Sequence, residues 1–210
     1  MTNGTDAGPA GDMRAFFAAR ADGWDTRFPD DGPAYAAAVR ALRLGPGDTV
    51  LDAGCGTGRA LPALRAAVGP AGTVLGVDLT PEMPAAAERA GRRDAGALAV
   101  ADAARLPLRD GCLDAVFAAG LVSHLPDPGG ALAELARVVR PGGALALFHP
   151  VGRAALAARK GRALTPGDLR AEPNLRPLLA VHGWRLHAYT DEDHRFLALA
   201  ERRGPAGDLL

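Results

Sequence analysis

Three aspartates each stand at the end of a short apolar, β-prone run: Asp52, Asp78 and Asp102. In an open parallel sheet, ligands bind in the crevice outside the carboxyl ends of the strands, so we expect these three side chains to share one site. Carboxylates accept hydrogen bonds from hydroxyl and amino groups, and they favour a ligand that carries positive charge. The three acids therefore indicate a pocket for a cationic nucleoside, with Asp78 placed to accept hydrogen bonds from two ribose hydroxyls.

A glycine turn follows the first acid, with glycines at positions 54, 56 and 58, and helix-prone residues 59–68 come next. Each missing Cβ lets the backbone turn tightly and lets a ligand approach the main chain. The start of the helix adds unpaired N–H groups and a partial positive charge. The spacing differs from the G-x-G-x-x-G pattern of dinucleotide sites, and an acid before the first glycine disfavours a phosphate. These differences argue against an NAD-dependent oxidoreductase, which stays an alternative.

Strand-like and helix-like segments alternate along the chain, which predicts an α/β fold with a mostly parallel sheet and helices on both faces. We expect strands over 49–52, 73–78, 98–101, 115–119, 144–148, 184–189 and 196–201. We expect helices over 13–21, 33–42, 59–68, 129–139 and 174–182, with another that begins after Thr80. The segment 23–29 reads as an aromatic loop, 140–143 as a tight turn, and 190–193 as the last turn. Glu134 is expected to face solvent.

Length and composition set limits on the class of protein. The chain has 210 residues, 48% of them hydrophobic, which suits one α/β domain with a full core. Its 24 Lys and Arg balance 24 Asp and Glu, so no nucleic-acid or membrane-surface partner is indicated. The two cysteines, far apart in sequence, predict reduced thiols and no metal site. Without a signal sequence or membrane-length apolar run, the expected location is the cytoplasm.

Five motifs in order resemble those of class I S-adenosylmethionine-dependent methyltransferases, most closely the small-molecule branch that includes the ubiquinone/menaquinone-biosynthesis type. The motifs occupy residues 50–58, 76–80, 101–108, 113–117 with 123–127, and 135–143. The resemblance is close over about residues 40–150 and loose elsewhere. It implies a Rossmann-like seven-stranded sheet with one antiparallel strand near the C-terminus. It also implies transfer of a methyl group from S-adenosylmethionine to a small-molecule acceptor by in-line displacement.

The resemblance further implies which residues bind the cofactor. Asp52 and the glycine loop would meet the methionine portion, Asp78 the ribose, and Asp102 with the N–H of Ala103 the adenine. Met83 would pack on the adenine, although an ordinary core position is the alternative for Met83, and a turn role is the alternative for Asp102. The expected cofactor-binding set is Asp52, Gly54, Cys55, Gly56, Gly58, Asp78, Leu79, Met83, Asp102, Ala103, Ala118, Trp24 and Tyr35. We expect Asp52 to order the glycine loop and Asp114 to be structural.

The resemblance also implies that the N-terminal segment lies over the cofactor and closes the substrate side. Trp24 or Tyr35 would then stack near the sulfonium, as a cation–π contact. The alternative is that these aromatic residues simply anchor the segment. We divide the chain into a cap segment (1–42, disordered over about 1–12), a cofactor-binding domain (43–203) and a tail (204–210).

Two histidines are candidates for a general base, which is needed only if the acceptor is a weak nucleophile. His149 follows the fifth expected strand and is the better placed, whereas His124 lies in the loop after the fourth. Either imidazole could instead be held by loop backbone or cap a helix. The basic segment 151–164 either recognises an acidic substrate or is a solvated surface. The acceptor and its reacting atom (O, N or C) stay open, as does the choice between monomer and homodimer. A non-catalytic S-adenosylmethionine-binding protein is the other alternative.

Overall fold

The computed structural model describes residues 9–27 and 31–204, with side chains from Met13 onward. The expected disorder of residues 1–8, the position of Phe28 and the tail from 205 lie outside the described residues. Disorder over 9–12 was wrong, because a helix already begins at Pro9. The helices and 3-10 helices (η) are α1 (Pro9–Ala18), η1 (Ala21–Gly23), α2 (Trp24–Arg27), α3 (Gly32–Ala41), α4 (Leu61–Val68), α5 (Glu82–Arg89), η2 (Arg92–Asp94), η3 (Val122–His124), α6 (Pro128–Val138), α7 (Arg153–Arg159) and α8 (Glu172–Val181).

Seven strands form one sheet in the order β3-β2-β1-β4-β5-β7-β6. Their bounds are β1 (Thr49–Ala53), β2 (Thr73–Asp78), β3 (Ala97–Val100), β4 (Leu113–Ala119), β5 (Val139–His149), β6 (Trp184–Glu192) and β7 (Arg195–Arg202). Neighbouring strands from β3 to β5 pair in parallel, whereas β7 runs antiparallel to both β5 and β6. The expected mostly parallel, Rossmann-like sheet with one antiparallel strand near the C-terminus is confirmed.

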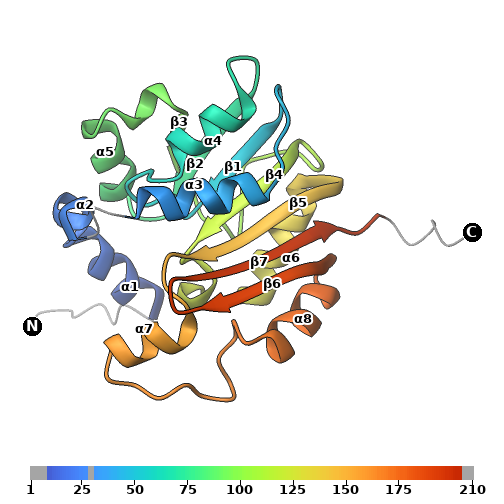
Figure 1. The fold of residues 1–210 in the computed structure, drawn as a ribbon. Helices are drawn as coiled ribbons and strands as arrows, with labels where there is room; N and C mark the ends of the chain where they lie inside the picture. Colours follow the sequence, from blue (N-terminus) through green and yellow to red (C-terminus); the bar gives the residue numbers. More distant parts are fainter. Residues whose placement is uncertain (1–8, 28–30, 205–210) are drawn as a thin grey trace, which may run out of the picture.

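The sheet is buried on both faces because residues of the central strands alternate between two cores. Val50 and Phe117 face the core that contains α3 and α4, whereas Leu51 and Ala118 face the core that contains α6 and α8. Figure 1 shows these two helix layers on opposite sides of the sheet. On the second side, the Trp184 indole is fully buried, and its N–H donates to the Leu132 carbonyl at 2.9 Å. Apolar runs in central strands require this double cover.

Several expected boundaries were wrong at connections. Residues 23–27 of the segment expected as an aromatic loop are helical, in η1 and α2. Residues 140–143 lie inside β5 as a bulge, because pairing with β4 begins at Val139 and resumes at Ala144 after a register shift. The last hairpin turns at 193–194 rather than over 190–193, since Glu192 and Arg195 already pair. Backbone pairing between strands extended these elements beyond the positions that local residue preference indicated.

Carboxylates of β4 and α6 bind backbone N–H groups of neighbouring segments. The Asp114 carboxylate accepts the N–H of Thr49 at 2.7 Å and pairs with Arg140 at 2.6 Å, which confirms its expected structural role. Glu134 was expected to face solvent, but its side chain is only 14% exposed. Its carboxylate accepts from the N–H of Leu106 at 2.7 Å and from Arg137, so it ties α6 to the loop after β3.

α1 and α2 lie at the left of Figure 1, beyond the carboxyl ends of the parallel strands, whereas α3 packs in the α3–α4 core. The aromatic ring of Phe17 lies edge-on to His124 at 5.3 Å, which brings α1 to the loop after β4. The division of the chain at residue 42 stays a prediction. Across residues 9–27 and 31–204, no helix combines the length and the apolar character needed to cross a membrane.

Candidate functional site

The glycine turn after β1 forms a loop that only glycine permits. Gly54, Gly56 and Gly58 all have positive φ angles, of 68°, 53° and 77°. A Cβ on Gly58 would also lie 2.8 Å from the Leu61 side chain, so this glycine is required by packing as well. Gly56 differs, because a Cβ there would meet only the Met83 sulfur at 3.9 Å. The loop thus presents bare main chain with open space beside Gly56, next to a buried methionine.

Asp78 joins the end of β2 to this loop. One carboxylate oxygen accepts the Gly56 N–H at 2.9 Å and the other accepts the Thr80 N–H at 2.9 Å. Burial raises the pKa of Asp78, and the two backbone hydrogen bonds act in the opposite direction. A carboxylate oxygen has two lone pairs, so each oxygen can still accept a hydrogen bond from a ligand hydroxyl. Leu79, which follows, is 43% exposed and offers an apolar surface beside these acceptors.

Asp52 is the most unusual group near the loop. Its side chain is 1% exposed, and neither carboxylate oxygen has a hydrogen-bond partner among the described residues. Burial, with a smaller contribution from the charge of Asp78, raises the pKa of Asp52 to about 8. The expectation that Asp52 orders the loop was wrong, because no loop N–H reaches it. A buried carboxylate without a donor is costly, and such groups mark functional sites.

The other expected cofactor-binding residues occupy three kinds of position. Cys55 points at β2, where its sulfur would lie 3.2 Å from a Cβ on Gly76, and burial raises the pKa of its thiol. The side chains of Met83, Ala103 and Ala118 are buried, at 2%, 6% and 2% exposure. Asp102 is exposed, and one of its carboxylate oxygens accepts the Ala104 N–H at 2.8 Å, the turn role that was its alternative.

The two aromatic candidates lie in different surroundings. The Tyr35 ring packs edge-on against Phe148 at 5.1 Å, beside Phe117, with the Arg59 guanidinium 5.5 Å above it. Tyr35 therefore anchors α3 on the sheet, and burial raises its pKa. Trp24 is half-buried in α2, 5.6 Å from the Phe17 ring. The proposed contact of either ring with a sulfonium stays a prediction.

The two histidines flank the end of the sheet next to β5. His149 Nδ1 lies 2.8 Å from the Val151 carbonyl oxygen and 3.0 Å from its nitrogen, so the loop backbone holds the imidazole, as the alternative expected. Burial lowers the pKa of His149 to about 4, so the ring is neutral at pH 7. Burial also lowers the pKa of His124, with smaller contributions from the charges of Lys160 and Arg170. Nε2 of His149 is left as the nitrogen able to act on a ligand.

Residues outside the expected set hold the N-terminal segment onto the glycine loop. The Thr57 hydroxyl donates to Asp25 at 2.6 Å, and Arg92 reaches both the Asp25 carboxylate at 2.6 Å and the Thr57 carbonyl at 2.5 Å. Arg89 pairs with Asp22 in the same way. The residues alone carried no signal for these contacts, because Asp25 and Arg92 are far apart in sequence and belong to no motif. A hollow of about 580 Å³ lies beside this contact, between η1 and α5.

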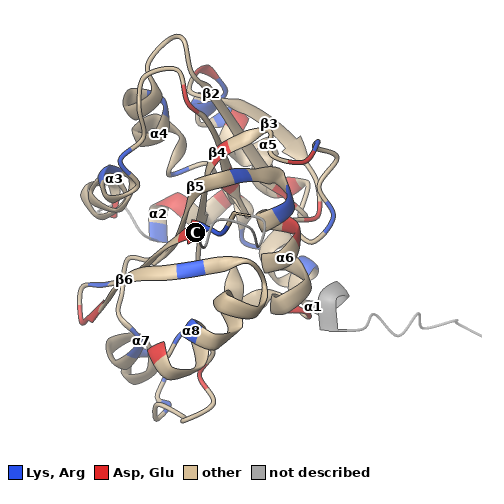
Figure 2. Cartoon of the chain, turned by 90° about the vertical axis from the view of Figure 1, so that its right-hand side faces the viewer, with Lys and Arg blue, Asp and Glu red and all other residues tan. Residues whose placement is uncertain are grey.

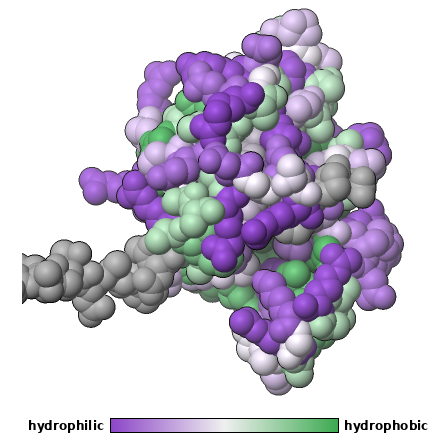
Figure 3. Space-filling view, turned by 90° about the vertical axis from the view of Figure 1, so that its left-hand side faces the viewer, coloured by the Kyte–Doolittle hydropathy of each residue, from purple (hydrophilic) through white to green (hydrophobic). Residues whose placement is uncertain are grey.

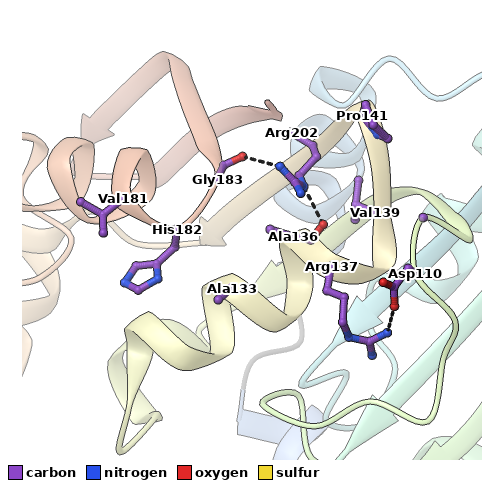
Figure 4. Close-up of a pocket in the computed structure, with 11 residues that line it drawn as sticks. Asp110, Ala133, Ala136, Arg137, Val139, Pro141, Val181, His182, Gly183 and Arg202 are labelled. Atoms are coloured by element: carbon purple, nitrogen blue, oxygen red, sulfur yellow. Dashed lines mark hydrogen bonds and ion pairs between the residues drawn. The ribbon is translucent and has the colours of Figure 1, made fainter. Parts of the chain in front are cut away.

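A second hollow, of about 560 Å³, lies away from the site, between the C-terminal part of α6, the start of β5 and the end of α8 (Figure 4). Its two arginines already have internal partners. Arg202 donates to the Ala136 carbonyl at 2.6 Å, and Arg137 pairs with Asp110 at 2.6 Å and with Glu134 at 2.7 Å. The arginines that line this hollow therefore stabilise the fold. The hollow lies at the amino-terminal ends of the parallel strands, opposite the glycine loop.

Comparison with known proteins agrees with the geometry. Residues 51–147 match the family described as "Methyltransferase domain". The chain is 43% identical over 114 residues to an uncharacterized 37.1 kDa protein in transposon TN4556 of Streptomyces fradiae. That alignment covers 52% of this chain and 32% of the other protein. It is 39% identical over 110 residues to the 27-O-demethylrifamycin SV methyltransferase of Amycolatopsis mediterranei, covering 50% of this chain and 40% of the relative.

The structural match extends over more of the chain. The crystal structure of a SAM-dependent methyltransferase from Aquifex aeolicus superposes with a TM-score of 0.67 at 26% identity, covering 80% of this chain and 89% of the other. The expected fold and the expected resemblance are thus confirmed. The alignments with the two curated relatives span only about a third to two fifths of those proteins' lengths.

Proposed function

We propose, from the match of residues 51–147 to the methyltransferase domain family, that this protein transfers a methyl group from S-adenosylmethionine to a small-molecule acceptor. The observation that carries the proposal is the buried Asp52 carboxylate, which has no hydrogen-bond partner among the described residues. The same region has open space at the Gly56 backbone, and both Asp78 oxygens have lone pairs left to accept from a ligand. A ligand with a cationic amino group and a ribose would supply the charge and the donors that these groups lack. The residues present therefore fit this cofactor.

When bound, S-adenosylmethionine supplies a methyl group already activated by a sulfonium. The chain's own contribution is to bind and to orient. Asp78 would hold the ribose hydroxyls, Met83 and Leu79 the adenine, and Asp52 the amino group near the loop. Holding two reacting groups in line can lower a barrier by several kcal/mol without any acid or base. The α1–α2 segment, held by Asp25 on Thr57, would exclude water from that side.

The direct test is methyl transfer itself. The purified full chain would be incubated with S-adenosylmethionine carrying a labelled methyl group and a panel of phenols, amines and quinols. Label in a small-molecule product, together with release of S-adenosylhomocysteine, is the expected result. Binding of S-adenosylhomocysteine without turnover would favour the non-catalytic alternative. Binding of NADH, followed by its fluorescence, in place of S-adenosylhomocysteine would contradict the proposal.

His149 is proposed as the base for an acceptor that must lose a proton. The ring is neutral at pH 7, and in the tautomer whose Nδ1–H donates to the Val151 carbonyl, the Nε2 lone pair can accept that proton. His149→Ala is expected to lower kcat by about 100-fold, the usual contribution of a positioned base, with unchanged affinity for S-adenosylhomocysteine. His124→Ala is the matched control and should lower kcat far less. Equal effects of the two substitutions, in steady-state rates with the same acceptor, would contradict this assignment.

The surface charge supports a small acceptor rather than a nucleic acid. Basic and acidic residues balance over the whole chain, and Figure 2 shows both kinds interspersed over the face it views. Nucleic-acid-binding domains instead gather Lys and Arg on one face. We propose that the protein acts in the cytoplasm as a monomer or homodimer, which light scattering on the purified chain and fractionation of the source cells would test.

A further inference from the structure

Arg170 is a nearly buried arginine whose donors are poorly used. Its side chain is 15% exposed, and its only ionic contact among the described residues joins Nε to Asp168 at 3.5 Å. Nε itself is buried without a hydrogen bond. A guanidinium has five N–H donors, and leaving buried donors unpaired costs free energy. Arg170 is therefore equipped to bind a further acceptor group.

The neighbouring Arg153, by contrast, forms ion pairs with two carboxylates. Its side chain is 12% exposed, and it pairs with Asp168 at 3.2 Å and with Asp191 at 3.4 Å. Asp168 thus already serves Arg153, and its other oxygen accepts the backbone N–H of Arg170 at 2.9 Å. Asp168 is thus shared by the two arginines, whereas Asp191 pairs with Arg153, so among the described residues Arg153 contacts two carboxylates and Arg170 contacts one.

The fold holds Arg170 next to the expected reaction centre. Its guanidinium lies 5.9 Å from the centre of the Phe196 ring, and Phe196 pairs with His149 across β7 and β5. The hydroxyl of Tyr189 donates to the Arg170 carbonyl at 2.8 Å, which fixes the backbone. Burial is the main cause of the lowered pKa of His149, and the positive charges of Arg170 and Lys160 lower it further.

The surface at this end is hollowed. Figure 3, which views the side where α1, α2 and α7 lie, shows hydrophobic residues in a recess between the lowest part of the molecule and its main body. The lowest part on that side is α7 with the loop that follows it, in which Arg170 stands just before α8. An apolar recess beside the segment that carries a cation suits an amphiphilic ligand with one anionic group.

We propose that Arg170 is a specificity-determining residue that binds a carboxylate on the methyl acceptor, with the apolar part of that acceptor in the recess. The proposal rests on the proposed function, because it assigns the substrate class of the same site. A carboxylate matches the planar fork of a guanidinium and can take two of its donors at once. The acceptor class is thus an aromatic or similarly apolar carboxylic acid, rather than a neutral or cationic molecule.

The test uses the full chain saturated with S-adenosylhomocysteine and labelled with ¹⁵N. It would be titrated with 4-hydroxybenzoate and, separately, with the neutral 4-hydroxybenzamide. The carboxylate is expected to bind about 10-fold more tightly, a difference of about 1.4 kcal/mol, and to shift the Nε–H resonance of Arg170. In Arg170→Gln the preference for the carboxylate should disappear. Arg159→Gln is the matched control, since Arg159 is exposed on α7, and it should keep the preference.

Three results would overturn the proposal: equal binding of the two probes, a preference that survives in Arg170→Gln, or no shift of the Arg170 resonance at millimolar carboxylate. Loss of S-adenosylhomocysteine affinity in Arg170→Gln would also overturn it, because the anion would then be the cofactor's own carboxylate. Failure of the unsubstituted chain to bind S-adenosylhomocysteine would instead contradict the proposed function, so the two failures are distinguishable.

Discussion

Replacement of Asp78 by alanine is expected to weaken S-adenosylhomocysteine binding by about 100-fold or more. The substitution removes the acceptors for two ribose hydroxyls, and hydrogen bonds to a charged group are each worth about 1.5–3 kcal/mol. It also releases the N–H groups of Gly56 and Thr80, so the glycine loop loses one of its attachments to β2 and keeps the bond from the Cys55 N–H to the Val77 carbonyl. Isothermal titration calorimetry of the variant and the unsubstituted chain would measure the loss.

Asp94→Ala is the matched control for this measurement, because Asp94 lies exposed in η2 after α5 and should leave the affinity unchanged. Asp102→Ala should have an intermediate effect, since the Asp102 side chain is exposed and one of its oxygens is already taken by Ala104. Unchanged affinity in a folded Asp78→Ala variant would refute the ribose assignment.

The second large effect concerns Asp52 and appears as a pH dependence of stability. The pKa of Asp52 is about 8 in the folded chain and about 4 in an unfolded one. Between pH 4 and pH 8, the Asp52 side chain holds a proton in the folded state and has released it in the unfolded state. The free energy of unfolding is therefore highest below pH 4 and falls as the pH rises toward 8. The amide in Asp52→Asn does not titrate, so its stability lacks this pH dependence. The free energy of unfolding of the variant should exceed that of the unsubstituted chain by little at pH 4 and by more than about 2 kcal/mol at pH 8.

Urea unfolding at both pH values, without ligand, would measure this difference. Asp193→Asn removes an exposed carboxylate in the last hairpin turn and should show no such trend. A stability difference that is the same at pH 4 and pH 8 would mean that Asp52 is not protonated in the folded chain. Because a cationic ligand favours the carboxylate, Asp52→Asn should at the same time weaken S-adenosylhomocysteine binding.

The elements that build the cofactor site were predictable because their signals are local. An apolar run of four to six residues predicts a buried strand, an acid and three glycines predict the loop after it, and a helical segment follows within the same stretch. Asp78 and the glycine loop were therefore placed together correctly, and the structure joins them directly through Gly56. The order of the strands came from the family resemblance, since the spacing of elements does not by itself decide which strands are neighbours.

The errors and omissions share another cause. Glu134 reads as a surface residue of a helix, and only the approach of the loop before β4 to α6 turns its carboxylate toward Leu106. Asp52 reads as a loop-ordering acid, but the loop turns its N–H groups elsewhere and the carboxylate stays without a partner. Each case depends on which backbone donors arrive from other segments, and periodicity carries no information on that.

The sequence by itself determined the class of fold, the acidic strand ends and the bare glycine loop, because these follow from backbone preference and from alternation of apolar residues over short stretches. Only the tertiary structure decided that Asp25 and Arg92 hold the N-terminal segment on Thr57, and that Arg170 stands near His149 with unused donors. These arrangements join residues separated by tens of positions. They exist because packing of the two cores brings distant segments together, and no local pattern records that packing.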